Sequence, residues 1–524
     1  MRKALLDGSA KAKNSTSFTQ NVPAPVKGWN TRDSLAEMDP LYAPTLDNWY
    51  PRSGQVILRG GSLDYATGMT GSAKSIFQYS PTSGTKKLYA STNSGIYDVT
   101  AGGAVGAVVK AATNGYINTV NFANSAGTNY LWCCNGTDTP FYFDGAAWTN
   151  ATITGIATPA NLTFPVVFKH RIFAIEKNSM NLWYLPIDSI QGAAGQLPYG
   201  NIMKLGGSLV SATSWTLDAG DGPDDLLAVV SSEGQLAVYK GTDPSSASSW
   251  AIVGVWFVGR PLGPRCFAPL GGDVLILTEN GVFPLSKLLQ SGNVNFASAL
   301  SNKIQPTWTN QVWFTGIIAP GWDATVYPQF DALIINVPST TATTAGQFVM
   351  NTVTGAWCSF SSWDYTSAIV YQGQFYFATA TGKLVQAWDN ANVLVNDNSN
   401  DIVATAVCAY NYFGNKTLLK KIELFRNLLT YNGAIQVSWA VSADYQRVNF
   451  SSMVPRGVSQ AGSLWDTVLW DTHYWATLGQ LSKYWRSSSH IPGYALSLQL
   501  QIATKDSTLT WAGSDYILHG GSAM

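Results

Sequence analysis

Few residues of this chain have the types and the spacing that catalysis requires. Its four histidines lie outside the H-E-x-x-H spacing of a zinc site, and the sequence contains neither a G-x-S-x-G turn nor a phosphate-binding loop. His170 lies between Lys169 and Arg171, and we expect it to be a turn residue rather than a general base. We therefore expect no metal and no cofactor, and zinc-dependent or nucleophilic hydrolysis has no support.

Paired carboxylates are the remaining route to catalysis, because two of them can hydrolyse a glycosidic bond. Asp144 in "FDGAAW" and Asp364 in "SWDYTS" are the candidates for such a pair. An aspartate beside a glycine or a tryptophan more often accepts hydrogen bonds from the backbone of a turn. The repeated Ser-x-Asp-x-Gly-x-x-Trp sequence of sialidase-like propellers is also absent. We expect both aspartates to cap turns, and we expect the protein not to be an enzyme.

The cysteines give no sign of metal binding or of disulfides. None of the five has metal-ligand spacing to another, their number is odd, and the neighbours Cys133 and Cys134 should point to opposite faces of one strand. We expect five reduced, mostly buried thiols, as in a protein assembled in the cytosol. The first 18 residues lack the apolar core of a signal peptide, and no apolar run is long enough to span a bilayer.

Charge is low and balanced. Charged residues make up 12 % of the chain, and 31 basic residues face 31 acidic ones. The sequence shows no basic stripe of the kind that holds nucleic acid, and we expect Lys169–Arg171 and Lys420-Lys421 to be solvated. Tight phosphate binding is therefore excluded, whereas a surface past which DNA slides is not. Frequent glycine and aromatic residues indicate short strands and tight turns.

One unit of strand, glycine turn, apolar strand, glycine turn and strand recurs along the chain. The apolar middle strands are spaced 41 to 59 residues apart, with a mean of about 48, which is typical of propeller blades. They begin near Leu88, Leu131, Ile172, Leu226, Val274, Leu333 and Phe375. We predict an all-β protein with a β-propeller of six or seven blades over residues 74–390. A pair of β-sandwiches is the alternative, although sandwiches rarely repeat one phrase so often.

The regions outside the predicted propeller do not contain this repeat. Residues 391–524 contain long alternating segments, and we predict a C-terminal antiparallel β-sandwich-like domain. Leu496, Leu498, Leu500 and Ile502 should form the buried face of a half-buried strand, and Asn432-Gly433 should turn a hairpin. Residues 1–26 are predicted to be a flexible arm. Residues 27–73 are rich in proline and aromatic residues and are predicted to be an irregular strap.

Aromatic residues outside the blades are the candidates for interaction. The strap contains Trp29, Tyr42, Trp49 and Tyr50, and the segment "LWDTVLWDTHYW" over residues 464–475 contains Trp465 and Trp470. The second segment has neither helical nor strand spacing. It could be a sugar-stacking loop, an oligomer contact or the edge of a turn-rich core.

Several phrases at both ends of the chain resemble one known family. "WNTRD" (residues 29–33), "MDPLYAPTLDNWYP" (38–51) and "VILRGG" (56–61) resemble the N-terminal segment of tail hub or nozzle proteins of short-tailed bacteriophages, also called packaged-DNA stabilisation proteins. "NKTLLKKIELFRNLL" (415–429), "LWDTVLWDTHYW" and "YWRSSSHIPGYALSLQLQIATKDSTLTW" (484–511) are similar to the C-terminal part of that family. The likeness covers the propeller only through its architecture.

The resemblance implies a structural virion protein. Proteins of this family have a propeller body and form six-fold rings below the portal and adaptor, with a lumen that continues the DNA channel. A homohexamer that retains packaged DNA, meets the adaptor and a tail fibre or needle, and is assembled in the host cytoplasm is therefore expected. Contacts between subunits would involve the strap residues Trp29, Arg32, Tyr42, Trp49 and Tyr50, together with Trp465 and Trp470. The alternatives are a strap that packs only on its own chain and a glycan-binding, lectin-like propeller.

Overall fold

The computed structural model describes residues 17–216, 225–290, 296–317, 320–338, 346–389, 394–456, 480–482 and 484–520. The chain forms two units. The first, called here the sandwich, draws on residues up to 29, on residues 33–58 and on residues from 403 onward. The second, called the propeller, consists of residues 30–32 and 59–402. Each is described by itself.

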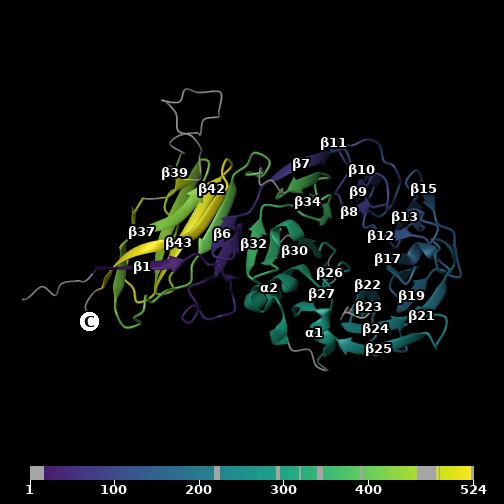
Figure 1. The fold of residues 1–524 in the computed structure, drawn as a ribbon. Helices are drawn as coiled ribbons and strands as arrows, with labels where there is room; N and C mark the ends of the chain where they lie inside the picture. Colours follow the sequence, from purple (N-terminus) through teal and green to yellow (C-terminus); the bar gives the residue numbers. More distant parts are fainter. Residues whose placement is uncertain are drawn as a thin grey trace, which may run out of the picture. The chain divides into compact units, whose positions relative to one another are not determined.

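The propeller contains seven groups of antiparallel strands that follow one another along the chain, called here sheets one to seven (Figure 1). Sheets one to three are β8–β10 (Ser75–Tyr79, Lys87–Thr92, Gly95–Asp98), β12–β15 (Asn118–Ala123, Asn129–Cys134, Phe141–Phe143, Trp148–Asn150) and β17, β18, β19 and β21 (Leu162–Phe168, Arg171–Glu176, Asn181–Tyr184, Gly195–Pro198). Sheets four and five are β22–β25 (Leu209–Thr216, Asp225–Ser231, Gln235–Gly241, Trp250–Phe257) and β26–β28 (Phe267–Leu270, Asp273–Thr278, Gly281–Pro284). Sheet six is β29–β32 (Asp323–Tyr327, Ala332–Val337, Gly346–Asn351, Trp357–Ser361). Sheet seven is β33–β35 (Ser367–Tyr371, Gln374–Ala378, Leu384–Ala387), extended by β7 (Ser62–Thr67) and β11 (Gly103–Ala104).

The second strand of every sheet is one of the apolar strands that the repeat predicted. All seven predicted starting points fall within β9, β13, β18, β23, β27, β30 and β34. These strands are buried along most of their length, as the six buried residues of β30 illustrate. A strand that is covered on both faces has no polar alternation, which is why the period was readable. The prediction of an all-β propeller is confirmed, and the number of blades is seven.

The ring closes through a strand from the N-terminal side. The first strands of successive sheets contact one another in chain order, and β33 of the last sheet contacts β8 of the first. β7 pairs antiparallel with β35, with Ala66 opposite Leu384 and Ser62 opposite Ala387. The last sheet is thus completed by residues that precede the first sheet. Strands from the beginning and the end of the propeller thus pair in one sheet. This pairing covers the strand edge at which the ring would otherwise open.

Apolar clusters fill the spaces between neighbouring sheets. Phe77 and Tyr89 of sheet one pack with Leu131 and Phe143 of sheet two. A further cluster joins sheets three and four, and another joins sheet seven to sheet one, where Tyr376 packs with residues such as Leu88. Aromatic pairs such as Tyr89 and Phe143, with ring centroids 5.7 Å apart, bury large areas at these contacts. The hydrophobic effect therefore holds neighbouring sheets together at these contacts.

Two short helices interrupt the ring between sheets five and six. α1 spans Leu285–Gln290 and α2 spans Gln305–Thr315. On α2, Trp308 and Val312 are buried whereas Trp313 and Phe314 are exposed. The other small elements of the propeller are β16 (Ile153–Thr154), β20 (Gly192–Ala193), η1 (Pro159–Asn161), η2 (Phe296–Ser298), η3 (Asn302–Ile304) and η4 (Pro328–Phe330). No helix in the described part of the chain is long and apolar enough to cross a membrane.

The sandwich is built from both ends of the chain. Its first sheet contains β1 (Ser17–Pro23), β5 (Trp49–Arg52), β6 (Gln55–Leu58), β37 (Lys420–Tyr431), β40 (Gln480–Leu481), β41 (Arg486–Ser487) and β43 (Leu509–Gly520). Its second contains β4 (Thr45–Asp47), β36 (Ile402–Val407), β38 (Ile435–Ala443), β39 (Val454–Arg456) and β42 (Leu496–Thr504), and β2 (Gly28–Trp29) pairs with β3 (Tyr42–Ala43). Phe425 and Leu518 of the first sheet pack with Val441 and Leu498 of the second. The predicted sandwich-like domain is confirmed.

The strand pairing inside the sandwich differs from the sequence prediction. Asn432-Gly433 was expected to turn a hairpin, but β37 pairs with β43 whereas β38 pairs with β42. The turn therefore carries the chain from one sheet to the other. A tight turn between two strands of alternating polar and apolar residues can join them as a hairpin or carry the chain from one sheet to the other. The alternation fixes only which side chains face the core, not which strand is the partner.

Two burial predictions in the sandwich are wrong. β42 was expected to be half-buried, but Ser497 and Gln499 on its polar face are also buried. They remain hydrogen-bonded, since Ser497 donates to the carbonyl of Cys408 (2.6 Å) and Gln499 donates to Ser442. Lys420 was expected to be solvated, but it is 1 % exposed and its ammonium donates to the carbonyl of Asn415 (2.7 Å).

The predicted domain boundaries change at the N-terminal side. Residues 1–26 were predicted to be a flexible arm, but Ser17–Pro23 forms β1 and pairs with β43 from Pro23 opposite Gly513 to Ser17 opposite His519. The predicted strap over residues 27–73 divides at Leu58 into strands of the sandwich and a strand of the propeller. Prolines did not prevent this, because Pro51 occupies the short hairpin of β5 and β6 and donates no hydrogen bond there.

The sandwich should be acid-sensitive through Asp515 of β43. Its Oδ2 accepts hydrogen bonds from Nε and Nη2 of Arg426 (3.0 and 2.5 Å), and its Oδ1 accepts one from Asn21 (2.7 Å). Burial, the largest single effect, raises the pKa of Asp515, but the hydrogen bonds from Asn21 and Arg426 and the charge of Arg426 outweigh it and lower that pKa.

An unfolded aspartate has a pKa of about 3.9, and the pKa of Asp515 in the folded protein is lower. The ionised Asp515 therefore stabilises the fold above the unfolded pKa, and this stabilisation is lost as the pH falls through the folded pKa. We expect thermal unfolding of the wild type to shift more between about pH 5 and about pH 3 than that of Asp515→Asn. Melting curves followed by circular dichroism across this range measure the difference. Equal pH dependence of the two proteins would contradict the assignment.

Candidate functional site

The centre of the propeller is lined by the first strands of all seven sheets. A small, mostly polar cavity of about 320 Å³ lies there. Its lining residues include Phe77, Asn118, Phe164, Ser211, Arg265 and Asp323. A concave, mostly polar cavity formed by several elements is a candidate ligand site.

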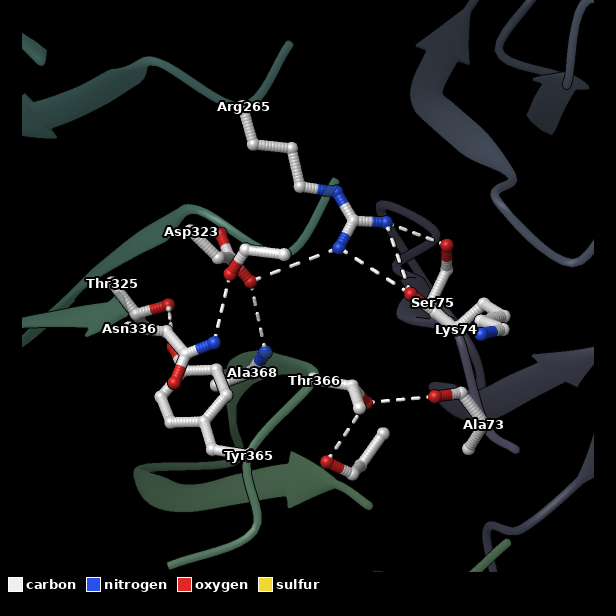
Figure 2. Close-up of polar contacts among 12 residues, drawn as sticks. Ala73, Lys74, Ser75, Arg265, Asp323, Thr325, Asn336, Tyr365, Thr366 and Ala368 are labelled. Atoms are coloured by element: carbon white, nitrogen blue, oxygen red, sulfur yellow. Dashed lines mark hydrogen bonds and ion pairs between the residues drawn. The ribbon is translucent and has the colours of Figure 1, made fainter. Parts of the chain in front are cut away.

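Arg265 crosses this centre. It precedes β26 of sheet five, and its Nη2 donates a hydrogen bond to Oγ of Ser75 in sheet one (2.5 Å) and lies 3.5 Å from the carbonyl oxygen of Lys74 (Figure 2). Its Nη1 lies 3.8 Å from Oδ2 of Asp323 in sheet six. One guanidinium thus joins sheet five to two other sheets, of which sheet six is its neighbour in the ring and sheet one is not. A fixed planar fork of donors is suited to this bridging role.

Asp323 is in turn held by the backbone. Its Oδ2 accepts a hydrogen bond from the amide of Ala368 at the start of β33 (3.1 Å), and Figure 2 shows it between that amide and Arg265. The carboxylate and the guanidinium therefore satisfy each other and the surrounding backbone. This arrangement can lock the ring at its centre. It provides no activated nucleophile, because both charged groups already have partners.

The two candidate carboxylates do what the turn interpretation predicts. Oδ1 of Asp144 accepts hydrogen bonds from the amides of Ala146 (2.8 Å) and Ala147 (2.7 Å), and these bonds, that of Ala147 first, lower the pKa of Asp144. Asp364 accepts a hydrogen bond from the amide of Ala380 (3.1 Å). Each caps a turn in its own sheet, the second and the seventh. Within the described residues, no group of three or more histidine, cysteine, aspartate or glutamate side chains could hold a metal ion.

The remaining reactive groups are also structural. None of the five cysteines forms a disulfide and four are buried, as predicted. Burial raises the pKa of the Cys266 thiol to about 12, which keeps it protonated and unreactive at neutral pH. Lys169 and His170 have φ angles of 46° and 57° and form the turn between β17 and β18, where a turn was predicted.

The predicted interaction residues fall into three groups. Trp49 and Tyr50 are fully buried in the sandwich, and the ring centroids of Trp49 and Trp511 lie 5.7 Å apart. In this structure they stabilise their own chain and offer no surface to a neighbour. Trp465 and Trp470 lie outside the described residues.

Trp29, Arg32 and Tyr42 are partly exposed, and their role in contacts between subunits stays a prediction. Trp29 donates a hydrogen bond from its indole nitrogen to the carbonyl of Pro44 (3.1 Å). Nη1 of Arg32 donates to Oδ1 of Asn302 (2.7 Å).

Arg59 is an important residue whose role the sequence did not reveal. Its side chain is fully buried, and its two terminal nitrogens donate to the two carboxylate oxygens of Asp397 (3.0 and 2.5 Å). Oδ1 of Asp397 also accepts from Ser62 Oγ at the start of β7 (2.9 Å). The phrase "VILRGG" drew attention to this position, but the partner lies 338 residues away in the sequence. The pair fixes the strand that closes the ring.

A second cavity of about 630 Å³ lies beside α2. It is lined by turns of sheets four and five and by the exposed Trp313. Sequence reasoning did not single out Trp313, although the sequence "TWTNQVWF" contains two tryptophans five residues apart, which a helix places on different faces.

Comparisons with known proteins leave the family of this chain open. No model of a protein family matches the sequence, and no curated protein matches it. Among solved structures, the crystal structure of BBS1N in complex with ARL6DN, soaked with lead, aligns at a TM-score of 0.38 and 9 % identity. The alignment covers 63 % of this chain and 98 % of that one. A similarity this weak carries no argument, so the description of the fold rests on the strand pairing itself.

Proposed function

We propose that this protein is a structural component of a bacteriophage tail, a homohexameric nozzle that retains packaged DNA and passes it on during ejection. One observation carries the proposal. The separate segments that resemble nozzle proteins, residues 27–61 near one end and residues 415–429 and 484–511 near the other, supply strands to one sheet, in which β6 and β37 both pair with β43. Except for residues 30–32 and 59–61, which belong to the propeller, phrases that are far apart in the sequence thus belong to one folded unit, as expected if they derive from one ancestral domain.

The properties of the propeller agree with a structural role. Its central carboxylate and guanidinium hold sheets together, and the candidate catalytic aspartates cap turns. Arg265 crosses the propeller centre, so a DNA channel would have to lie between subunits and not through a propeller. A chain with 31 basic and 31 acidic residues would let duplex DNA pass without strong retention by its phosphates.

The test is the mass of the purified protein, alone and after addition of the phage adaptor, combined with negative-stain images. We expect six-fold rings with a lumen wide enough for duplex DNA, because a head-to-tail interface with a closing rotation produces a cyclic ring. Persistent monomers under both conditions would overturn the proposal. Trp470→Ser examines the predicted contact segment, and it should reduce ring formation without changing the circular dichroism spectrum of the monomer. Trp29→Ala provides the same test for the strap.

A further inference from the structure

The cavity beside α2 has the composition of a small-ligand site. It lies within the propeller, and its volume of about 630 Å³ is in the range typical of pockets for small molecules. Three turns form its polar wall, those that contain Glu233, Arg260 and Glu279, and the helix α2 forms the other wall. These elements belong to sheets four and five and to the helix that follows them. The cavity is therefore formed by connections between propeller strands on one side and by a helix on the other.

Trp313 gives this cavity an aromatic surface. The residue is 84 % exposed, the largest exposure among the large hydrophobic residues of the described chain, and it lines the cavity. The preceding residue, Val312, is buried and anchors this turn of α2. An exposed indole ring offers a flat apolar face on which a ligand can stack, and its N–H remains available as a hydrogen-bond donor.

The polar wall offers donors and acceptors close together. Nη2 of Arg260 lies 3.4 Å from Oε2 of Glu233, and the amide of Arg260 donates to Oε1 of Glu279 (3.3 Å). The side chains of Arg260 and Glu233 are 51 % and 37 % exposed, so much of each polar group faces solvent. Asn280 and Thr309 add an amide and a hydroxyl to the lining. The wall thus presents groups of both hydrogen-bonding types around one aromatic face.

We propose that this cavity binds a sugar ring of a glycan, with the apolar face of the ring stacked on Trp313 and its hydroxyls bound by Glu233, Arg260 and Glu279. A pyranose has an apolar C–H face and a rim of hydroxyls that both donate and accept, which matches an indole beside carboxylate and guanidinium groups. Phosphate ligands are disfavoured because two carboxylates face one guanidinium. A cationic ligand is disfavoured because that guanidinium lies in the wall.

The proposal does not depend on the proposed role in a phage tail, and it can be tested on the purified protein in any oligomeric state. Saturation-transfer NMR would use chitobiose, cellobiose, lactose and maltose at millimolar concentration. We expect transfer to at least one of them, strongest at the C–H protons of the stacked face. Trp313→Ala should reduce the affinity at least about tenfold, which corresponds to the loss of 1.4 kcal/mol. Glu279→Gln should reduce it as well while leaving the aromatic surface intact.

Phe314→Ala is the matched control. Phe314 is the next residue on α2 and is 55 % exposed, but it does not line the cavity, so this variant should bind the sugar as the wild type does. Absence of saturation transfer to all four disaccharides would overturn the proposal, and so would unchanged affinity in Trp313→Ala. If the Trp313 and Phe314 variants bind no less sugar but both lose assembly, this face is a protein contact and the sugar proposal is wrong.

Discussion

Replacing Arg59 by methionine is expected to lower the free energy of unfolding of the propeller by about 3–5 kcal/mol, because the substitution leaves the carboxylate of Asp397 without its counter-charge in a poorly solvated place. Arg59 is fully buried, and Asp397 retains only 12 % of its side-chain exposure. The guanidinium also donates to the carbonyls of Gly60 (2.9 Å) and Ser361 (3.0 Å), which would lose a donor. Removing one member of a buried pair costs far more than the pair itself contributes.

The effect should be concentrated at the closure of the ring. Asp397 binds Arg59 and also Ser62, the first residue of β7, and the guanidinium lies 4.8 Å from the ring centroid of Trp363. Hydrogen exchange should therefore lose protection first in β7 and its partner β35. Urea unfolding of the whole chain would give the size of the loss. Arg59→Lys should recover little of it, because an ammonium cannot make the two parallel bonds to the carboxylate.

An exposed ion pair at the same closing sheet is the control. Nζ of Lys383, the residue before β35, lies 2.6 Å from Oδ2 of Asp64 in β7, but the lysine is 41 % exposed. Lys383→Met should change stability by no more than about 1 kcal/mol, as is usual for solvent-exposed pairs. Equal losses in the Arg59 and Lys383 variants would show that burial of the first pair does not determine its contribution.

The propeller could be predicted from sequence because its signal is local. The middle strands are apolar on both faces and each lies between glycine turns, so their positions were readable one by one, as at Leu131 and Leu333. Their number gave the number of blades once the structure showed that each one is the second strand of a separate sheet. The closing strand β7 was missed, since six residues with a half-exposed pattern resemble any edge strand.

The sandwich was predicted only as a class of fold. Its long strands alternate, but alternation does not say whether β37 pairs with its neighbour in sequence or with β43 at the far end of the chain. Pairing with the N-terminal strands was equally invisible. β1 contains Gln20 and Asn21 among seven residues and buries none of them, so a mobile arm was the natural interpretation.

The candidate sites show the same limit. The turn-capping role of Asp144 could be predicted because its partner amides lie two and three residues further on, whereas the partner amide of Asp364 lies 16 residues away in sequence. Arg59 could not be assigned a role, because its carboxylate partner is supplied by a distant segment. The phrase "VILRGG" therefore has a physical meaning: its arginine and glycines are needed where the chain enters the ring.

Gly61→Ala is expected to lower the free energy of unfolding by about 3 kcal/mol or more, at or above the upper end of the usual cost of overpacking. A Cβ at Gly61 would lie 2.0 Å from the carbonyl oxygen and 2.5 Å from the amide nitrogen of Asn396. Both atoms belong to the backbone and cannot move aside by a change of rotamer. The amide of Gly61 donates to Leu394 (2.7 Å) and its carbonyl accepts from Trp388 (2.8 Å), so the segment is fixed on two sides.

Gly106→Ala separates this steric effect from the general cost of replacing a glycine. A Cβ at Gly106 would meet no atom within 4 Å, and neither glycine has the left-handed φ that would strain an alanine. Restricting the unfolded chain then makes Gly106→Ala neutral, or stabilising by less than about 1 kcal/mol. Urea unfolding of both variants measures the contrast. A Gly61→Ala protein as stable as Gly106→Ala would mean that residues 394–397 can withdraw from the closing strand without cost, and that the pair of Arg59 and Asp397 does not hold them there.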